Sequence, residues 1–131
     1  MIKLKFGSIE IMGYIGGLLW GAIIAVRLFP LPANEVHRLI IGIAPNLGAA
    51  WVVTLLSKWV IIFALKQNYT VKQHAFICIS IVILALASEF IHDAFLGSPF
   101  DVYDMIITIV AQLCMFTIPI ISKDQYFENY T

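Results

Sequence analysis

Four runs of apolar residues, each long enough to cross a lipid bilayer, constrain the fold of this chain more than any other feature. A transmembrane helix needs about 20 mostly apolar residues, and the runs at 9–28, 39–65, 74–95 and 102–121 meet that requirement. Only 12% of the 131 residues are charged, about half the share found in soluble domains. The sequence therefore predicts an all-α integral membrane protein, a single four-helix bundle with short loops and no soluble domain.

The second apolar run is longer than one span requires, and a proline interrupts it. Pro45 can occupy the first turn of a helix, where its missing N–H costs nothing, which gives a span of about 45–65. Alternatively, the helix begins near residue 39 and kinks at Pro45. The sequence leaves both starts open, and in the first case we expect Lys58 to extend its charged end toward one membrane surface.

The distribution of lysine and arginine predicts how the helices cross the membrane. With four spans, the two termini and the middle loop share one side, whereas Arg27 and Arg38 lie on the other. Because positive residues accumulate on the cytoplasmic side, we expect a multi-pass protein of the inner (plasma) membrane with both termini in the cytoplasm. The residues on that side are Lys3, Lys5, Lys66, Lys72 and Lys123.

Charge and cysteine content exclude several other classes of protein. The net charge is zero, so the chain lacks the basic surface that nucleic acid requires. Cys78 and Cys114 lie within apolar runs and form no CxxC motif, which indicates small buried thiols rather than a disulfide framework. His37 and His74 stand alone at the edges of spans, and we interpret them as interface residues.

Glycines recur along the first apolar run at a spacing that favours close helix packing. Gly13, Gly17 and Gly21 form two overlapping GxxxG pairs, and small residues at this spacing let two helix backbones approach each other in lipid. The pattern predicts tight packing within the bundle. Pairing with a second copy or with a partner membrane protein through this face is the alternative.

Acidic residues are concentrated between residues 88 and 104, next to and partly inside the apolar runs. At 1.5 Å per residue, Glu89 lies roughly 10 Å below the outer end of the third helix. A carboxylate at that depth should face the bundle interior and find a partner. His92 follows at i+3 and therefore shares the face of Glu89.

The residues that follow predict a tight turn and a capped fourth helix. Gly97 can end the third helix in a left-handed conformation, and Pro99 cannot continue it. Asp101 is placed to cap the next helix, with Asp104 in its first turn. The same helix face then continues through Thr108 and Gln112.

A helical hairpin with this turn should gather the polar residues into one cluster near the outer membrane surface. Arg27 and Arg38 are the available counter-charges. The cluster is either a structural lock for the hairpin or a functional site that binds a polar headgroup or a cation or moves a proton. Its members are Glu89, His92, Asp101, Asp104, Thr108 and Gln112.

Metal binding and serine catalysis receive little support from the sequence. Glu89 and His92 form one ExxH pair, and Asp104 could add a third ligand, but di-iron bundles use two such pairs and two further glutamates. We therefore predict no resident metal or cofactor. No GxSxG motif is present, and the catalytic residues of any enzymatic activity stay unknown.

The stretch "SEFIHDAFLGSPFDVYDMIITIVAQL" resembles the core motif of the VanZ-like family of small bacterial membrane proteins. That motif has an acid and a glutamine near the end of one span, a short turn, an Asp-x-x-Asp pair, and then an asparagine and a glycine. Glu89 matches the acid, and Asp101 and Asp104 match the pair. The chain departs from the motif at His92 (glutamine in the family), Thr108 (near the asparagine) and Ala111 (near the glycine).

The resemblance implies a cell-envelope protein, because members of the family belong to the cell envelope and its founding member is linked to resistance to the glycopeptide teicoplanin. Under this interpretation the outward acidic cluster engages a polar lipid headgroup, an envelope precursor or a glycopeptide, and so contributes to antibiotic resistance. One alternative is a membrane enzyme that acts on lipid or prenyl-phosphate headgroups with Mg²⁺ held by the acids. The other is a non-catalytic subunit that packs within a larger membrane complex.

Overall fold

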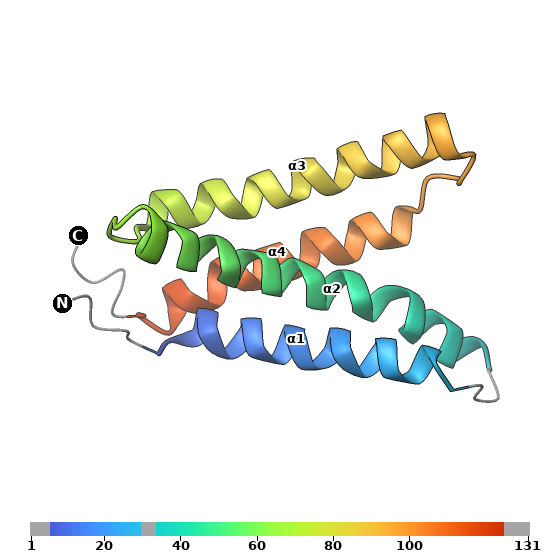
Figure 1. The fold of residues 1–131 in the computed structure, drawn as a ribbon, viewed down its shortest axis with the longest axis horizontal. Coiled ribbons are helices and arrows are strands. Elements are labelled where there is room, and N and C mark those ends of the chain that lie inside the picture. The colour runs from blue at the N-terminus through green and yellow to red at the C-terminus, as the bar shows by residue number, and fades with distance from the viewer. Residues whose placement is uncertain (1–5, 30–33, 125–131) are drawn as a thin grey trace.

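The computed structural model describes residues 6–29 and 34–124, and all of its regular elements there are helices (Figure 1). The predicted all-α, four-helix architecture is confirmed, and each long helix has the length and hydropathy needed to cross a membrane. A π-helix, η1, directly extends α2, so the two form one continuous rod. The elements are α1 (Ser8–Arg27), α2 (Glu35–Trp59), η1 (Val60–Ala64), α3 (Val71–Leu96) and α4 (Val102–Ile121).

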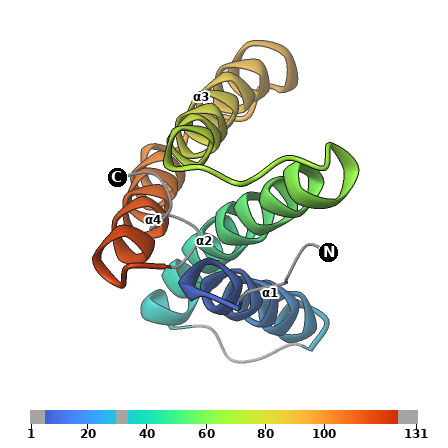
Figure 2. The ribbon, with the colours of Figure 1, turned by 90° about the vertical axis from the view of Figure 1, so that its left-hand side faces the viewer.

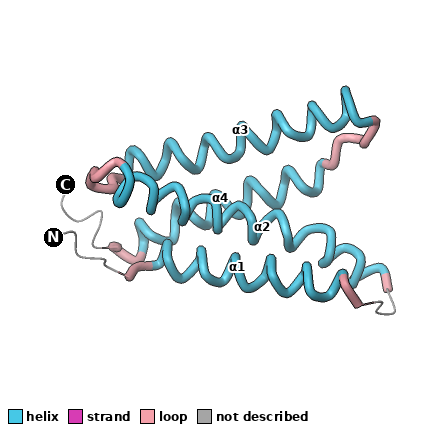
Figure 3. Tube along the Cα trace, in the orientation of Figure 1, coloured by secondary structure: helices cyan, strands magenta, loops and turns pink. Residues whose placement is uncertain are grey.

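Short connections join the helices, and local capping explains where most helices begin and end (Figure 3). Thr70 caps the start of α3 in a capping box with Gln73, in which each side chain accepts a hydrogen bond from the backbone N–H of the other residue. As predicted, Gly97 ends α3 in the left-handed region at φ 65°. Also as predicted, Asp101 caps α4, accepting hydrogen bonds from the backbone N–H groups of residues 103 and 104.

The second helix begins earlier than either start that the sequence suggested. The side chain of Asn34 caps α2 by accepting a hydrogen bond from the His37 N–H at 2.8 Å, and Pro45 lies inside the helix. A proline removes the hydrogen bond to the carbonyl four residues before it, which here belongs to Ile41. The Arg27 guanidinium donates to that carbonyl oxygen at 3.0 Å, so a neighbouring helix supplies the missing donor.

The helices form an open arrangement in which α2 is central. It packs against α1 and α4, while α3 packs mainly against α4 and does not contact α1 within the described residues (Figure 2). We call the end where α1 begins and α4 ends the terminal end, and the end with the α3–α4 turn the hairpin end. Near the hairpin end α3 diverges from α2 (Figure 1), and most of its side chains from residue 83 onward are exposed.

Small residues bring the backbones of α1 and α2 together inside the bundle, and the glycines involved share only Gly13 with the expected set. A Cβ atom on Gly16 would lie 2.7 Å from the Gly48 carbonyl oxygen, and one on Gly13 would lie 2.4 Å from the Leu55 side chain. The close approach of α1 to α2 therefore falls on Gly13, Gly16 and Gly48. By the same measure Gly17 makes only an ordinary contact, and Gly21 has no atom within 4 Å.

Candidate functional site

At the hairpin end, Glu89 and Asp101 hold the α3–α4 turn together. The Glu89 carboxylate accepts a hydrogen bond from the backbone N–H of Asp101 at 3.1 Å. The Asp101 carboxylate in turn accepts from the backbone N–H groups of Tyr103 at 2.9 Å and Asp104 at 3.3 Å. These contacts fit the structural part of the role expected for the cluster, because they fix the end of α3 to the start of α4.

Asp104 joins the same group from the first turn of α4. Its half-buried carboxylate hydrogen-bonds the side chain of Asn46 on α2 and interacts electrostatically with Asp101 and Glu89. The structure therefore brings three of the expected acids close together, and it adds Asn46, which the sequence pattern did not single out. The sequence feature that could have indicated Asn46 is its amide side chain within the apolar run of α2.

The remaining charged members of the expected cluster lie elsewhere. His92 is exposed near the end of α3. Within the described residues no salt bridge joins Arg27 or Arg38 to the acids. Arg27 and Arg38 stay possible counter-charges; the Arg27 guanidinium donates to the Ile41 carbonyl oxygen that Pro45 leaves without a helical donor.

Thr108 and Gln112 continue the polar face of α4, but they serve helix contacts below the acids. The Thr108 hydroxyl donates to the Asp104 carbonyl oxygen within α4 at 2.8 Å. The buried Gln112 amide donates to the Ala50 carbonyl oxygen on α2 at 3.1 Å and bonds the Thr54 hydroxyl. At 1.5 Å per residue Gln112 lies about 12 Å along the helix from Asp104, so it contributes to helix packing rather than to the acidic end.

Metal-binding geometry is not found in the part of the chain that the structure describes. No group of three or more His, Cys, Asp or Glu side chains there is arranged to hold a metal ion. Of the weak candidate set Glu89, His92 and Asp104, the two acids are half-buried and His92 is exposed. The set therefore forms no such group.

A second polar cluster, which the sequence analysis missed, lies near the terminal end. Lys58 of α2 forms a salt bridge with Glu10 of α1, and both side chains are almost completely buried. The expectation that Lys58 extends toward a membrane surface is therefore wrong. Because α1 and α2 run antiparallel, the start of α1 lies at the level of the end of α2, and this pairs an acid and a base from two apolar runs.

His74 and Tyr69 are buried beside this pair, so the interpretation of His74 as an interface residue is also wrong. The Tyr69 hydroxyl hydrogen-bonds Nδ1 of His74 at 2.7 Å, and Nε2 contacts the Met115 carbonyl oxygen of α4 at 2.8 Å. Pro119 follows Met115 by four residues and leaves that carbonyl without its helical donor. His74 thus supplies a hydrogen-bond donor to the carbonyl freed by Pro119, as Arg27 does for the carbonyl freed by Pro45.

The start of α1 and the end of α4 are tied together beside the second cluster. Asp124 is buried and accepts hydrogen bonds from the backbone N–H and the hydroxyl of Ser8, each at 2.9 Å. An acid at the N-terminus of a helix also suits the helix dipole. The contact holds the two ends of the described chain against each other.

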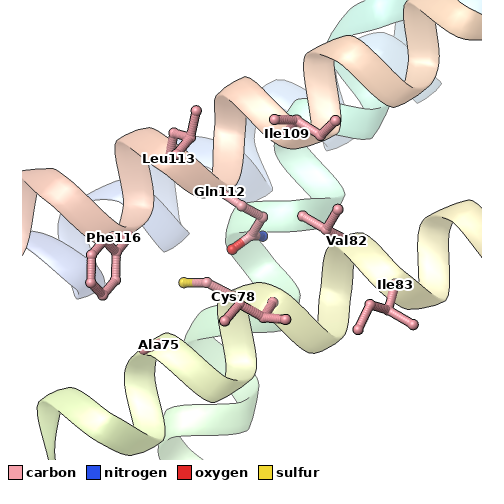
Figure 4. A pocket seen from close by; sticks show the side chains of 9 residues that line it. Ala75, Cys78, Val82, Ile83, Ile109, Gln112, Leu113 and Phe116 are labelled. Carbon is pink, nitrogen blue, oxygen red and sulfur yellow. The ribbon is translucent and has the colours of Figure 1, made fainter.

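An apolar pocket with a volume of about 270 Å³ lies between α3 and α4 (Figure 4). Gln112 and Cys78 lie on its inner side, and Ile83, Leu113 and Phe116 complete the wall. The Gln112 amide is already bonded to α2, so the pocket presents almost entirely hydrocarbon. Both cysteines are free thiols, with Cys78 buried and Cys114 partly buried.

No protein-family model, no curated protein and no solved structure matches this chain.

Proposed function

We propose that this chain is a small multi-pass protein of the bacterial plasma membrane, of the VanZ-like cell-envelope type. Its hairpin end faces outward and binds a polar, positively charged group of a lipid headgroup, an envelope precursor or a glycopeptide. Four helices with the length and hydropathy of membrane spans support the membrane part of the proposal. The residues of the α3–α4 hairpin that resemble the family motif support the rest.

The observation that carries the proposal is the convergence of three carboxylates at one end of the bundle. Asp104 interacts electrostatically with both Asp101 and Glu89, and the described residues offer these acids no salt bridge. Like charges held together without a counter-ion attract a cation. An ammonium group is such a cation, and it is common in lipid headgroups and in amine-bearing antibiotics.

The hydrogen bonds within the turn leave room for a ligand. An ionised carboxylate has about four acceptor positions, and the described contacts of Glu89 use one of them. The Asp101 carboxylate uses one oxygen for its two capping contacts. The acids can therefore hold the turn and still accept hydrogen bonds from a bound headgroup.

The experiment measures teicoplanin susceptibility in a bacterium that expresses the chain. Expression of the wild type should raise the inhibitory concentration, and Glu89→Gln and Asp104→Asn should return it to the level of cells without the protein. Both substitutions remove a charge and keep the shape of the side chain. Asp101→Asn is a third variant that preserves the helix cap, since asparagine caps as well as aspartate.

Asp93→Asn is the matched control, because Asp93 is an exposed acid on the same helix. It should behave as the wild type at equal membrane levels. If all three variants of the cluster protect as well as the wild type, or if the wild type gives no protection, the proposed function is wrong.

The two alternatives gain no specific support from the geometry. Mg²⁺ is commonly held by one or two carboxylates together with water and substrate phosphates, and no group of three or more candidate ligands among the described residues favours this alternative. A packing subunit requires an exposed small-residue face, whereas the glycines in close contact are used between α1 and α2.

A further inference from the structure

The polar cluster at the terminal end is a second site, separate from the hairpin acids. We call it the inner cluster and define it as Glu10, Lys58, Tyr69 and His74, which come from α1, α2, the connection before α3, and α3. All four side chains have at most 2% of their surface exposed. Ionisable groups buried among apolar helices are expensive and commonly mark a functional site.

The contacts of His74 determine which ring nitrogen carries hydrogen. The Met115 carbonyl oxygen can only accept, so Nε2 must be the protonated nitrogen in that 2.8 Å contact. In a neutral ring Nδ1 is then an acceptor. Its partner is the Tyr69 hydroxyl at 2.7 Å, which must donate.

Tyr69 is able to remain this donor. Burial raises the pKa of Tyr69 above its ordinary value, and nearby Cys78 and Glu10 raise it further. The hydroxyl therefore keeps its hydrogen at neutral pH. If His74 gains a proton at Nδ1, the ring donates to the Tyr69 oxygen and the hydroxyl hydrogen turns away, while the contact of Nε2 with Met115 is unchanged.

The groups around His74 act on an added proton in opposite directions: burial of the ring and Lys58 oppose a positive charge there, whereas the Met115 carbonyl and Asp124 favour it. Lys58 lies 5.6 Å from the centre of the Tyr69 ring and opposes a second positive charge, but Glu10 forms a salt bridge with it. Asp124, after α4, interacts electrostatically with both Lys58 and His74. Among the described residues, the acids of this group are Glu10 and Asp124, and the base is Lys58.

The inner cluster lies close to the terminal end of the bundle. His74 is in the first turn of α3, and Asp124 lies three residues after the end of α4, so both lie close to the terminal end. The Gln112–Thr54 contact joins α2 and α4 on the side of the cluster toward the hairpin end. A proton would thus enter from the aqueous phase at the terminal end.

We propose that the inner cluster is a proton-binding site in which His74 takes up one proton at Nδ1 from the terminal side of the bundle. Tyr69 exchanges its role from donor to acceptor as the proton binds. Asp124 favours the added positive charge on His74, and Glu10 offsets part of the opposing charge of Lys58. This proposal is independent of the function assigned to the hairpin end.

The test is a pH titration of the full chain in lipid nanodiscs, labelled with ¹⁵N at histidine and followed by NMR. The chain has three histidines, and His37→Gln and His92→Gln assign their signals. At high pH His74 should show the tautomer with hydrogen on Nε2. As the pH is lowered through and below the range of about 5–8, where histidine ordinarily titrates, the ring should become doubly protonated, because its burial opposes the charged form.

Two variants connect the titration to the cluster. Asp124→Asn removes a negative charge and keeps an acceptor for Ser8, so it should move the His74 midpoint to lower pH by several tenths of a unit. Tyr69→Phe removes the partner of Nδ1 and should also change the midpoint. Asp93→Asn at the hairpin end is the control and should leave it unchanged, as should His92→Gln.

The proposal is overturned if His74 keeps one protonation state over the whole range in which the chain stays folded. It is equally overturned if His74 titrates but neither Asp124→Asn nor Tyr69→Phe changes its midpoint. If one variant fails to fold, the other decides, and the exposed His92 provides an internal reference in each sample.

Discussion

At the residue scale, the most consequential feature is a pair of opposite charges inside apolar helices. At most 2% of the surface of Glu10 or Lys58 is exposed, and the two side chains form a salt bridge. Removing two charges from water costs several kcal/mol per ion, and their attraction offsets this only while both are present. Removing either charge alone would therefore leave the other buried without its ion-pair partner and would destabilise the fold.

Lys58→Met should lower the free energy of unfolding by about 3–5 kcal/mol, because it leaves Glu10 as an uncompensated buried charge. The double variant Glu10→Gln with Lys58→Met removes both charges and should recover most of that loss. Reversible denaturation in detergent measures all three proteins. A double variant less stable than the single one would show that the pair contributes through its contacts with Tyr69 and Asp124 instead.

At the element scale, two helices contain an internal proline, and each proline is matched by a base from a neighbouring helix. Arg27 of α1 serves the carbonyl freed in α2, and His74 of α3 serves the one freed in α4. A buried carbonyl without a donor is costly. The prolines therefore specify which helices are neighbours as well as where each helix is interrupted.

The contact between α1 and α2 gives a matched pair of glycine substitutions. Gly16→Ala should destabilise the chain, because the new Cβ would lie 2.7 Å from the Gly48 backbone oxygen. Gly21→Ala has open space and should be neutral or stabilising by up to about 1 kcal/mol, since alanine favours helix. Thermal melting in detergent compares them, and equal melting temperatures would contradict the close approach.

At the scale of the whole molecule, the two polar clusters lie at opposite ends of the bundle. The acids gather at the α3–α4 turn, and the inner cluster lies where all four helices are linked, with Met115 contributing from α4. The proposed orientation places the first outside the cell and the second near the cytoplasm. Under the two proposals, the ligand and the proton would bind from different compartments.

The orientation can be measured by labelling introduced cysteines after Cys78 and Cys114 are replaced by alanine. Ser98→Cys at the hairpin end should react with a membrane-impermeant maleimide in intact cells. Lys123→Cys at the terminal end should react only after the cells are opened. The reverse pattern would overturn the orientation that the lysine and arginine distribution predicts.

The sequence by itself determined the number of helices, the α3–α4 turn and the grouping of Glu89, Asp101 and Asp104. These features depend on local properties: apolar length, the left-handed conformation of Gly97, and a capping aspartate. Their spacing along the chain is short, so helix geometry alone brings them together. The start of α2 was placed too late, because Pro45 suggested a helix start and its lost hydrogen bond is replaced from another helix.

Only the tertiary structure decided which distant side chains meet. The Glu10–Lys58 pair, the contact of His74 with Met115, and the approach of Gly16 to Gly48 join residues from different helices. Such contacts depend on which helices are neighbours and on how each is rotated about its axis. Hydrophobicity fixes neither when a helix is apolar on nearly every side, so the few polar atoms that need partners determine the packing.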